Sequence, residues 1–105
     1  MTTPARYRII LSKRVAVDLQ GIFDHIAKDS MANAAGIVER ILDAIASLDT
    51  FPHRNIVEGQ NPKIKKPVRS LPVKPYLIYF QVDNDKMVVR ILRVRHGARR
   101  RLRRF

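Results

Sequence analysis

Cysteine is absent from the 105-residue chain, so neither disulfide bonds nor thiolate groups for metal binding or nucleophilic attack are available. The fold must therefore be held by packing, as is usual in a reducing cytoplasm. Residues 1–8 lack the apolar core of a secretory signal, and no apolar run approaches the roughly 20 residues that cross a bilayer. We expect a cytoplasmic protein that does not enter a membrane.

Acidic residues are few. The chain has 9 Asp and Glu against 21 Lys and Arg, which gives a formal net charge of +12. Such a charge on a short chain attracts polyanions and acidic proteins. Arginine supplies 14 of the 21 cations, and its planar guanidinium binds phosphate and carboxylate groups in a bidentate way. The expected partner is therefore negatively charged, and specific contacts are favoured over loose attraction.

The sequence also lacks the motifs of several enzyme classes. It has no glycine-rich phosphate-binding loop and no helix that carries two histidines at the spacing of metal ligands. Ser70 lies beside Arg69 and far along the chain from His96, which is a weak basis for a catalytic triad. We therefore expect no metal, no organic cofactor and no hydrolase chemistry of the serine or cysteine type.

The composition indicates one globular domain. Hydrophobic residues make up 46% of the chain and charged residues 29%, which suits a folded protein rather than a disordered one. A chain of this length buries one core and is too short to divide into two. The predicted domain comprises residues 1–98, and residues 99–105 form a basic C-terminal tail.

Hydrophobic periodicity in the first part of the chain predicts a strand and then a helix. Alternating apolar and basic residues favour a strand over residues 6–11. Apolar residues at three- and four-residue steps then predict a helix from Lys13 to Lys28, with Ser12 as its N-cap. On the outer face of this helix, Arg14 and Asp18 are four residues apart and are expected to pair.

A second helix is predicted from about Ser30, whose hydroxyl can cap it, to the residues before Pro52, which cannot continue a helix. Its apolar stripe comprises Ala34, Val38, Ile41, Ile45 and Leu48. Two such helices joined by a short turn would lie antiparallel as a hairpin. Membrane binding is the alternative interpretation of these stripes, but both polar faces mix acidic with basic residues, which favours packing against a core.

The remaining part of the chain predicts a loop and three strands. Residues 52–67 contain prolines and Gly59 without any period, which predicts a long basic surface loop, either functional or a solvated connector. A short strand is predicted over residues 68–71, and a stronger one over 76–82 that is apolar on both faces and should be central. Residues 83–85 favour a turn, after which residues 87–95 return as the partner strand of a hairpin.

These elements predict an α+β fold in the order β-α-α-β-β-β. A two-helix hairpin packed on one face of a largely antiparallel four-stranded sheet would bury all the apolar stripes.

Positive charge replaces apolar residues at the end of the last predicted strand. By simple alternation, Arg93 and Arg95 share a face with Ile91, whereas Arg90 and His96 fall on the other face. A buried, unpaired guanidinium is very costly, so this end of the strand must leave the core or meet an acidic partner.

We expect Arg93, Arg95, His96 and Arg99 to form a dense cationic group at the rim of the sheet. His96 could act as a general acid or base, because an imidazole can exchange a proton near neutral pH. The alternative is an ordinary surface or hydrogen-bonded histidine, which is favoured because no carboxylate lies nearby in the sequence. The arginine run of residues 99–101 fits an electrostatic contact with DNA, RNA or an acidic protein segment.

Two stretches resemble the RelE/ParE toxin superfamily: residues 68–82, VRSLPVKPYLIYFQV, and residues 91–99, ILRVRHGAR. The resemblance extends upstream to Ser12 with its helix and to the LDTFP motif at residues 48–52, so it covers nearly the whole chain. It implies the fold predicted above and a toxin of a type II toxin–antitoxin system. It also implies a cognate antitoxin as partner, with which a hetero-oligomer could form.

The superfamily has two main activities, because RelE-like members cut messenger RNA within the ribosome whereas ParE-like members inhibit DNA gyrase. In the nuclease branch an arginine commonly follows the aromatic residue at the start of the central strand, where this chain has Leu77. A tyrosine often follows the last strand in that branch, where this chain has arginines. The LPV and HGAR motifs are similar to those of the ParE branch, so the resemblance favours gyrase inhibition.

Each interpretation assigns its own residues. Gyrase inhibition assigns partner binding to the cationic strand end and tail, at Arg93, Arg95, His96, Arg99, Arg100 and Arg101. The alternative, a ribosome-dependent mRNA endoribonuclease, has as its candidate catalytic residues Arg69, Arg93, Arg95 and His96. A third interpretation, a basic nucleic-acid-binding module, depends on charge alone and predicts binding that weakens steeply with salt.

Overall fold

The computed structural model describes residues 6–50, 52, 56–60 and 66–97. In chain order the elements are β1 (Arg8–Leu11), α1 (Lys13–Ala27), α2 (Met31–Ala46), a short 3-10 helix η1 (Ser47–Asp49), β2 (Ile56–Gln60), β3 (Pro67–Val73), β4 (Tyr76–Asp83) and β5 (Val88–His96). The predicted α+β class, the helical hairpin and the largely antiparallel sheet are confirmed.

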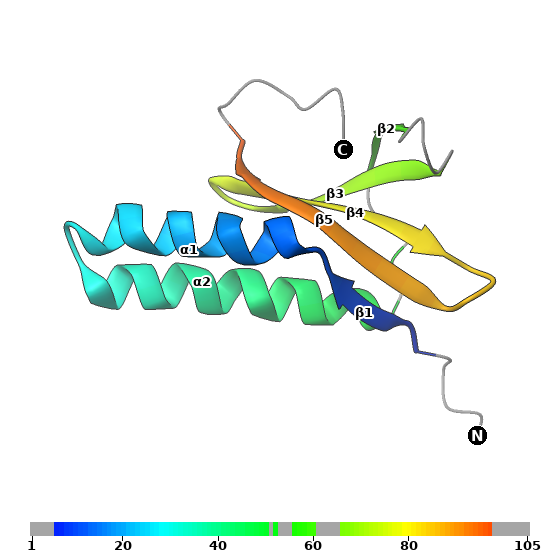
Figure 1. Ribbon diagram of the computed structural model, residues 1–105, viewed down its shortest axis with the longest axis horizontal. Coiled ribbons are helices and arrows are strands. Elements are labelled where there is room, and N and C mark those ends of the chain that lie inside the picture. Colours follow the sequence, from blue (N-terminus) through cyan, green and yellow to red (C-terminus); the bar gives the residue numbers. More distant parts are fainter. Residues whose placement is uncertain (1–5, 51, 53–55, 61–65, 98–105) are drawn as a thin grey trace.

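The strands form one mixed sheet in the order β1-β5-β4-β3-β2. β1 lies parallel to β5, and the other neighbouring pairs are antiparallel. β4 is the middle strand, as its apolar residues on both faces predicted. Because β1 pairs with β5, the first and last strands of the chain lie side by side (Figure 1).

The prediction of four strands is wrong, because the segment expected to be a loop contains a fifth strand, β2. This strand pairs with β3, and its register shifts between Val57 and Gly59. Glycine within a strand and prolines beside it obscure the alternation from which strands are predicted. Such a sequence is tolerated at the edge of a sheet, which is where β2 lies.

The two helices cover one side of the sheet and extend beyond its edge (Figure 1). Their apolar stripes meet the sheet in one core, whose buried members include Val15, Ile41, Ile45, Leu48, Ile78, Phe80, Val89, Ile91 and Val94. The helical faces predicted from the sequence are therefore confirmed. No helix among the described residues combines the length and the hydropathy that crossing a membrane requires.

The two predicted helix caps differ in outcome. The Ser30 hydroxyl accepts a hydrogen bond from the Asn33 amide at 3.1 Å and caps α2 as predicted. The Ser12 hydroxyl forms no cap bond and instead donates to the Leu92 carbonyl at 2.9 Å. Ser12 thus fastens the start of α1 to β5.

Replacing Ser30 by alanine is expected to lower the free energy of unfolding by about 1 kcal/mol, because one amide at the start of α2 loses its acceptor. Urea denaturation of the purified chain measures the change. Ser30→Asp is the matched control, since aspartate is an equally good cap and should retain the stability of the original protein. Equal midpoints for all three proteins would show that the cap has no energetic role.

The turn between β4 and β5 is held by the Asp83 carboxylate. Its Oδ2 lies 3.0 Å from Lys66 Nζ, and its Oδ1 accepts the Lys86 amide at 3.1 Å. The hydrogen bond from the Lys66 ammonium, followed by that from the Lys86 amide, lowers the pKa of Asp83 below its usual 3.8. The native state therefore favours the ionised form of this carboxyl.

A lowered native pKa contributes stability above the pKa of the unfolded chain, and this contribution is lost as the pH falls through the native value. Asp83→Asn should therefore be less stable than the original protein at pH 7, and the difference should shrink as the pH falls below about 4. Thermal unfolding at a series of pH values tests this. Asp85→Asn, an exposed neighbour in the same turn, is the control. A difference that does not change with pH would contradict the assignment.

Candidate functional site

The cationic end of β5 is shaped by a β-bulge. Tyr79 of β4 lies opposite Arg93 and Phe80 lies opposite Ile91, so Leu92 has no residue across from it. An extra residue of this kind reverses the alternation of side chains along the strand beyond it. The face assignments made by simple alternation along β5 are therefore wrong.

The bulge places three arginines on one face of β5. Across the β4–β5 pair, Arg90 is opposite Gln81, Arg93 is opposite Tyr79 and Arg95 is opposite Leu77. These β4 residues alternate with Ile78 and Phe80, which belong to the core under the helices. Since residues that pair across strands share a face, all three guanidinium side chains start from the side of the sheet that the helices leave uncovered.

Arg93 is bound by Asp18 of α1. Its Nε and Nη2 donate to the two carboxylate oxygens at 2.8 and 2.9 Å, and the Val94 amide donates to the same carboxylate at 2.9 Å. The two side chains are only 17% and 10% exposed, and the hydrogen bonds from Arg93 to Asp18 raise the pKa of the guanidinium above its usual value. Arg93 therefore connects the sheet to α1.

Asp18 also completes the edge of β5. Pairing with β1 stops at Leu11 opposite Ile91, so the outer edge of β5 is uncovered by any strand from Leu92 onward. The Ser12 hydroxyl then bonds the Leu92 carbonyl, and Asp18 bonds the Val94 amide. The start of α1 thus continues the hydrogen bonding that β1 began, which fixes the direction in which β5 leaves the sheet.

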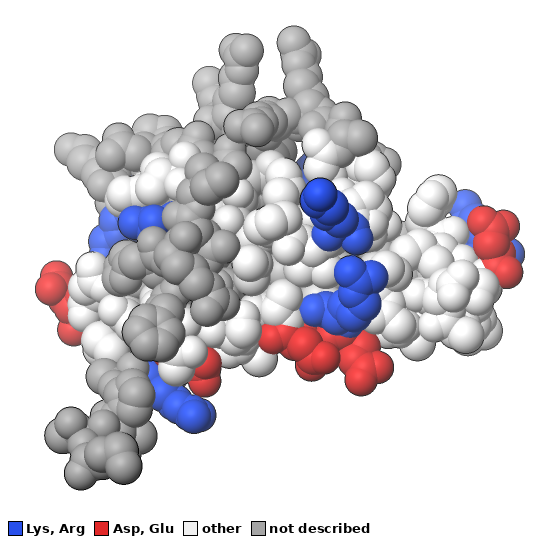
Figure 2. Space-filling view, turned by 180° about the vertical axis from the view of Figure 1, so that it is seen from behind, with Lys and Arg blue, Asp and Glu red and all other residues white. Residues whose placement is uncertain are grey.

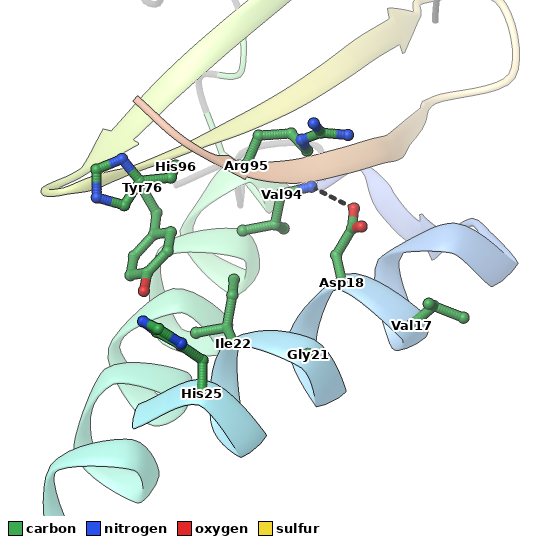
Figure 3. A pocket seen from close by; sticks show the side chains of 9 residues that line it. All are labelled: Val17, Asp18, Gly21, Ile22, His25, Tyr76, Val94, Arg95 and His96. Carbon is green, nitrogen blue, oxygen red and sulfur yellow. Dashed lines mark hydrogen bonds between the residues drawn. The ribbon is translucent and has the colours of Figure 1, made fainter. Parts of the chain in front are cut away.

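Arg95 and His96 follow this anchor and point to different sides. The Arg95 guanidinium points away from α1, whereas His96 lies beside Tyr76 (Figure 3). The rings of His96 and Tyr76 meet edge to face, with centroids 5.5 Å apart and planes at 79°. The Gly97 amide then donates to the Pro75 carbonyl at 2.7 Å, which holds the strand end against the turn before β4.

The candidate catalytic residues of the nuclease interpretation are not gathered on one face. Arg69 pairs with Phe80 and His96 pairs with Tyr76, on the helix side of the sheet. Arg93 and Arg95 start from the other side, and Arg93 is held by Asp18. Among the partner-binding candidates, the residues at 99–101 lie outside the described part of the chain.

The face of the molecule opposite to the one in Figure 1 carries a mixture of basic and acidic side chains among the described residues. Figure 2 shows basic side chains next to acidic ones in the middle of this face and again at the end formed by the helical hairpin. The described basic residues of this face therefore do not form one continuous patch. Within the described residues, no three His, Asp or Glu side chains come together in a way that could hold a metal ion.

The role of Asp18 in this site was not predicted, because its spacing from Arg14 predicted a surface pair. A signal was present, since Asp18 lies three residues after Val15 and four before Ile22, both of which contribute to the core. An acidic residue beside an apolar helix stripe needs a buried partner. The contribution of His25 and Tyr76 to a cleft beside β5 was also missed, because those residues are far apart in the sequence.

The comparison with protein families decides the family. Residues 9–101 match the sequence model described as the ParE toxin of the type II toxin–antitoxin system parDE. The chain belongs to the ParE toxin family. The match confirms that this ParE-family toxin belongs to the RelE/ParE superfamily that its sequence resembles, and it favours the ParE branch. The sequence matches no curated protein.

Solved structures share the fold of this ParE-family toxin. A chain of the chromosomal ParDE system from P. aeruginosa is 21% identical, with a TM-score of 0.68 over 89% of this chain and 98% of that one. A chain of the RelE–RelB complex from the archaeon Pyrococcus horikoshii is 17% identical, with a TM-score of 0.66 over 90% and 99%. A chain of a RelBE toxin–antitoxin complex from Mycobacterium tuberculosis is 21% identical, with a TM-score of 0.58 over 94% and 100%.

Proposed function

We propose that this ParE-family toxin inhibits DNA gyrase in the cytoplasm and that a cognate antitoxin neutralises it by binding. The observation that carries the proposal is the row of arginines at positions 90, 93 and 95 on the face of β5 opposite the helices. The middle arginine is held by Asp18, which leaves Arg90 and Arg95 available for an acidic or polyanionic partner. The arginines of the tail would extend this contact.

The placement of the nuclease candidates favours a binder over a nuclease. Cleavage of RNA needs an acid or base and a cation positioned around the same phosphate. His96 packs on Tyr76 on the helix side, whereas the Arg95 guanidinium points away from it (Figure 3). Leu77, which lies opposite Arg95, stands where the nuclease branch commonly has an arginine. A toxin that inhibits another enzyme by binding to it does not need an acid or base and a cation around one phosphate.

A supercoiling assay with purified gyrase tests the proposed target. Micromolar toxin should block supercoiling of relaxed plasmid and leave gyrase stalled on cleaved DNA. The cognate antitoxin, added in equal amount, should restore supercoiling. If gyrase keeps its full supercoiling activity and the toxin instead stops translation in a ribosome extract, the target is not gyrase. The alternative function, an mRNA endoribonuclease, would then be favoured.

Antitoxin binding has its own test. In the structures compared above, RelE–RelB and RelBE are complexes of a toxin with its antitoxin. A small acidic protein encoded beside this chain should form a complex with it that survives gel filtration at physiological salt. If none of the adjacent reading frames yields such a protein, the antitoxin part of the proposal fails.

A further inference from the structure

A cleft of about 360 Å³ lies between α1 and the ends of β4 and β5 (Figure 3). Its apolar walls come from Val17, Ile22 and Val94, and its polar groups include His25 and Tyr76. Helix α1 and the two strands are fixed relative to one another by the bonds of Asp18 to β5. The cleft is therefore a preformed feature of the fold.

Tyr76 contributes its hydroxyl group to this cleft. The residue is only 7% exposed, and its ring packs on His96. Its hydroxyl points toward the ring of His25 on α1 (Figure 3), yet neither group forms a hydrogen bond with any of the described residues. Among the described residues the only buried polar side-chain atom without a partner is Gln81 Oε1, so the Tyr76 hydroxyl is accessible from the cleft. Both groups can therefore donate a hydrogen bond to a ligand that enters the cleft.

The charge of the cleft favours an anion. Its one carboxylate, Asp18, already accepts two hydrogen bonds from Arg93 and one from the Val94 amide. The Tyr76 hydroxyl and a His25 nitrogen can both donate, and the whole chain carries a net charge of +12. A carboxylate entering the cleft would therefore meet donors without facing an unpaired negative charge.

Gly21 opens the helix side of the cleft. A side chain at this position would meet nothing within 4 Å, so packing within the chain does not require glycine here. Glycine in a helix interior is unfavourable relative to alanine. It does leave room for another backbone to approach the helix closely, as a peptide ligand would.

We propose that this cleft binds a carboxylate side chain in an acidic segment of a partner protein. The carboxylate accepts hydrogen bonds from the Tyr76 hydroxyl and a His25 nitrogen, and the apolar stem of the peptide packs on Val17 and Ile22. The inference rests on the proposed toxin function in expecting a protein partner. It does not depend on which enzyme the toxin inhibits.

Two blocked dipeptides probe the site in the full-length chain. Acetyl-leucyl-glutamate amide should shift the NMR amide signals of Gly21, His25 and Tyr76 and bind in the millimolar range. Its neutral analogue, acetyl-leucyl-glutamine amide, should bind about tenfold more weakly, because the charge-assisted hydrogen bonds are lost. AMP serves as the nucleotide probe and should leave these signals unchanged.

Variants separate binding from folding. Tyr76→Phe keeps the ring and its packing on His96, and should weaken binding of the glutamate peptide about tenfold. Gly21→Ala should raise the melting temperature by about 4–8 °C through its helix propensity and at the same time weaken binding. Gly36→Ala on α2, where a side chain also meets nothing within 4 Å, should raise the melting temperature without affecting binding.

The inference would be overturned by equal affinity for the two dipeptides, by AMP shifting the same signals, or by undiminished binding of the glutamate peptide to Tyr76→Phe. Absence of any shift with the glutamate peptide would overturn it as well. If the chain still inhibits gyrase in that case, only the cleft assignment fails. Loss of gyrase inhibition with intact peptide binding would instead remove the proposed target and leave the cleft as a docking site.

Discussion

Replacing Asp18 by alanine is expected to lower the free energy of unfolding by about 3 kcal/mol. The change leaves the Arg93 guanidinium and the Val94 amide without their acceptor in a region that is only 10–17% exposed. Removing one partner of a largely buried ion pair costs about 3–5 kcal/mol, because the remaining charge is uncompensated. We expect the lower end of that range, since the Arg93 side chain keeps some access to water.

Guanidinium chloride denaturation measures this loss. Asp24→Ala is the matched control, because Asp24 lies on the same helix, is exposed and accepts one hydrogen bond from Gln20. It should change the free energy of unfolding by no more than about 0.5 kcal/mol. If Asp18→Ala proves as mild as the control, Asp18 does not anchor β5 in solution.

Replacing Arg90 and Arg95 together by glutamine is expected to raise the toxin concentration that half-inhibits gyrase about tenfold or more. Both side chains start from the face of β5 opposite the helices, where Arg90 is exposed and Arg95 is partly exposed. Arginine is enriched among the few interface residues whose loss costs about 2 kcal/mol or more, and about 1.4 kcal/mol changes affinity tenfold. Supercoiling assays over a series of toxin concentrations measure the concentration that half-inhibits gyrase.

The double change Arg14→Gln with Arg40→Gln is the control for net charge. Both of these arginines are exposed on the helices, so the control removes the same charge from another surface. It should leave the inhibitory concentration within about twofold, because distant surface charges act weakly at physiological salt. Equal losses from both double variants would mean that overall charge matters and the β5 row does not.

Most of the fold could be predicted because apolar residues recur at regular intervals in its helices and strands. The stripes of α1 and α2 repeat at three and four residues, and β4 is apolar on both faces, which predicted a central strand. β2 could not be predicted, because its glycine and the prolines near it hide a pattern that only pairing with β3 reveals. Edge strands depend on their neighbour more than on their own sequence.

The candidate site was predicted in position but not in geometry. The arginine-rich end of β5 was visible in the sequence, whereas the bulge at Leu92 was not, because a bulge leaves no mark in a run such as Ile91-Leu92-Arg93. As a result, Arg90 was placed on the wrong face relative to Arg95. The bond between Asp18 and Arg93 joins residues 75 positions apart, a distance over which helical spacing gives no information.

Expression of the full-length chain without its antitoxin is the most direct test of a ParE-like toxin that acts on DNA gyrase. In a growing bacterial culture, induction should stop growth and activate the DNA-damage response while messenger RNA stays intact. Co-expression of the cognate antitoxin should restore growth. Continued growth, or arrest with cleaved messages and no DNA damage, would contradict the proposed function.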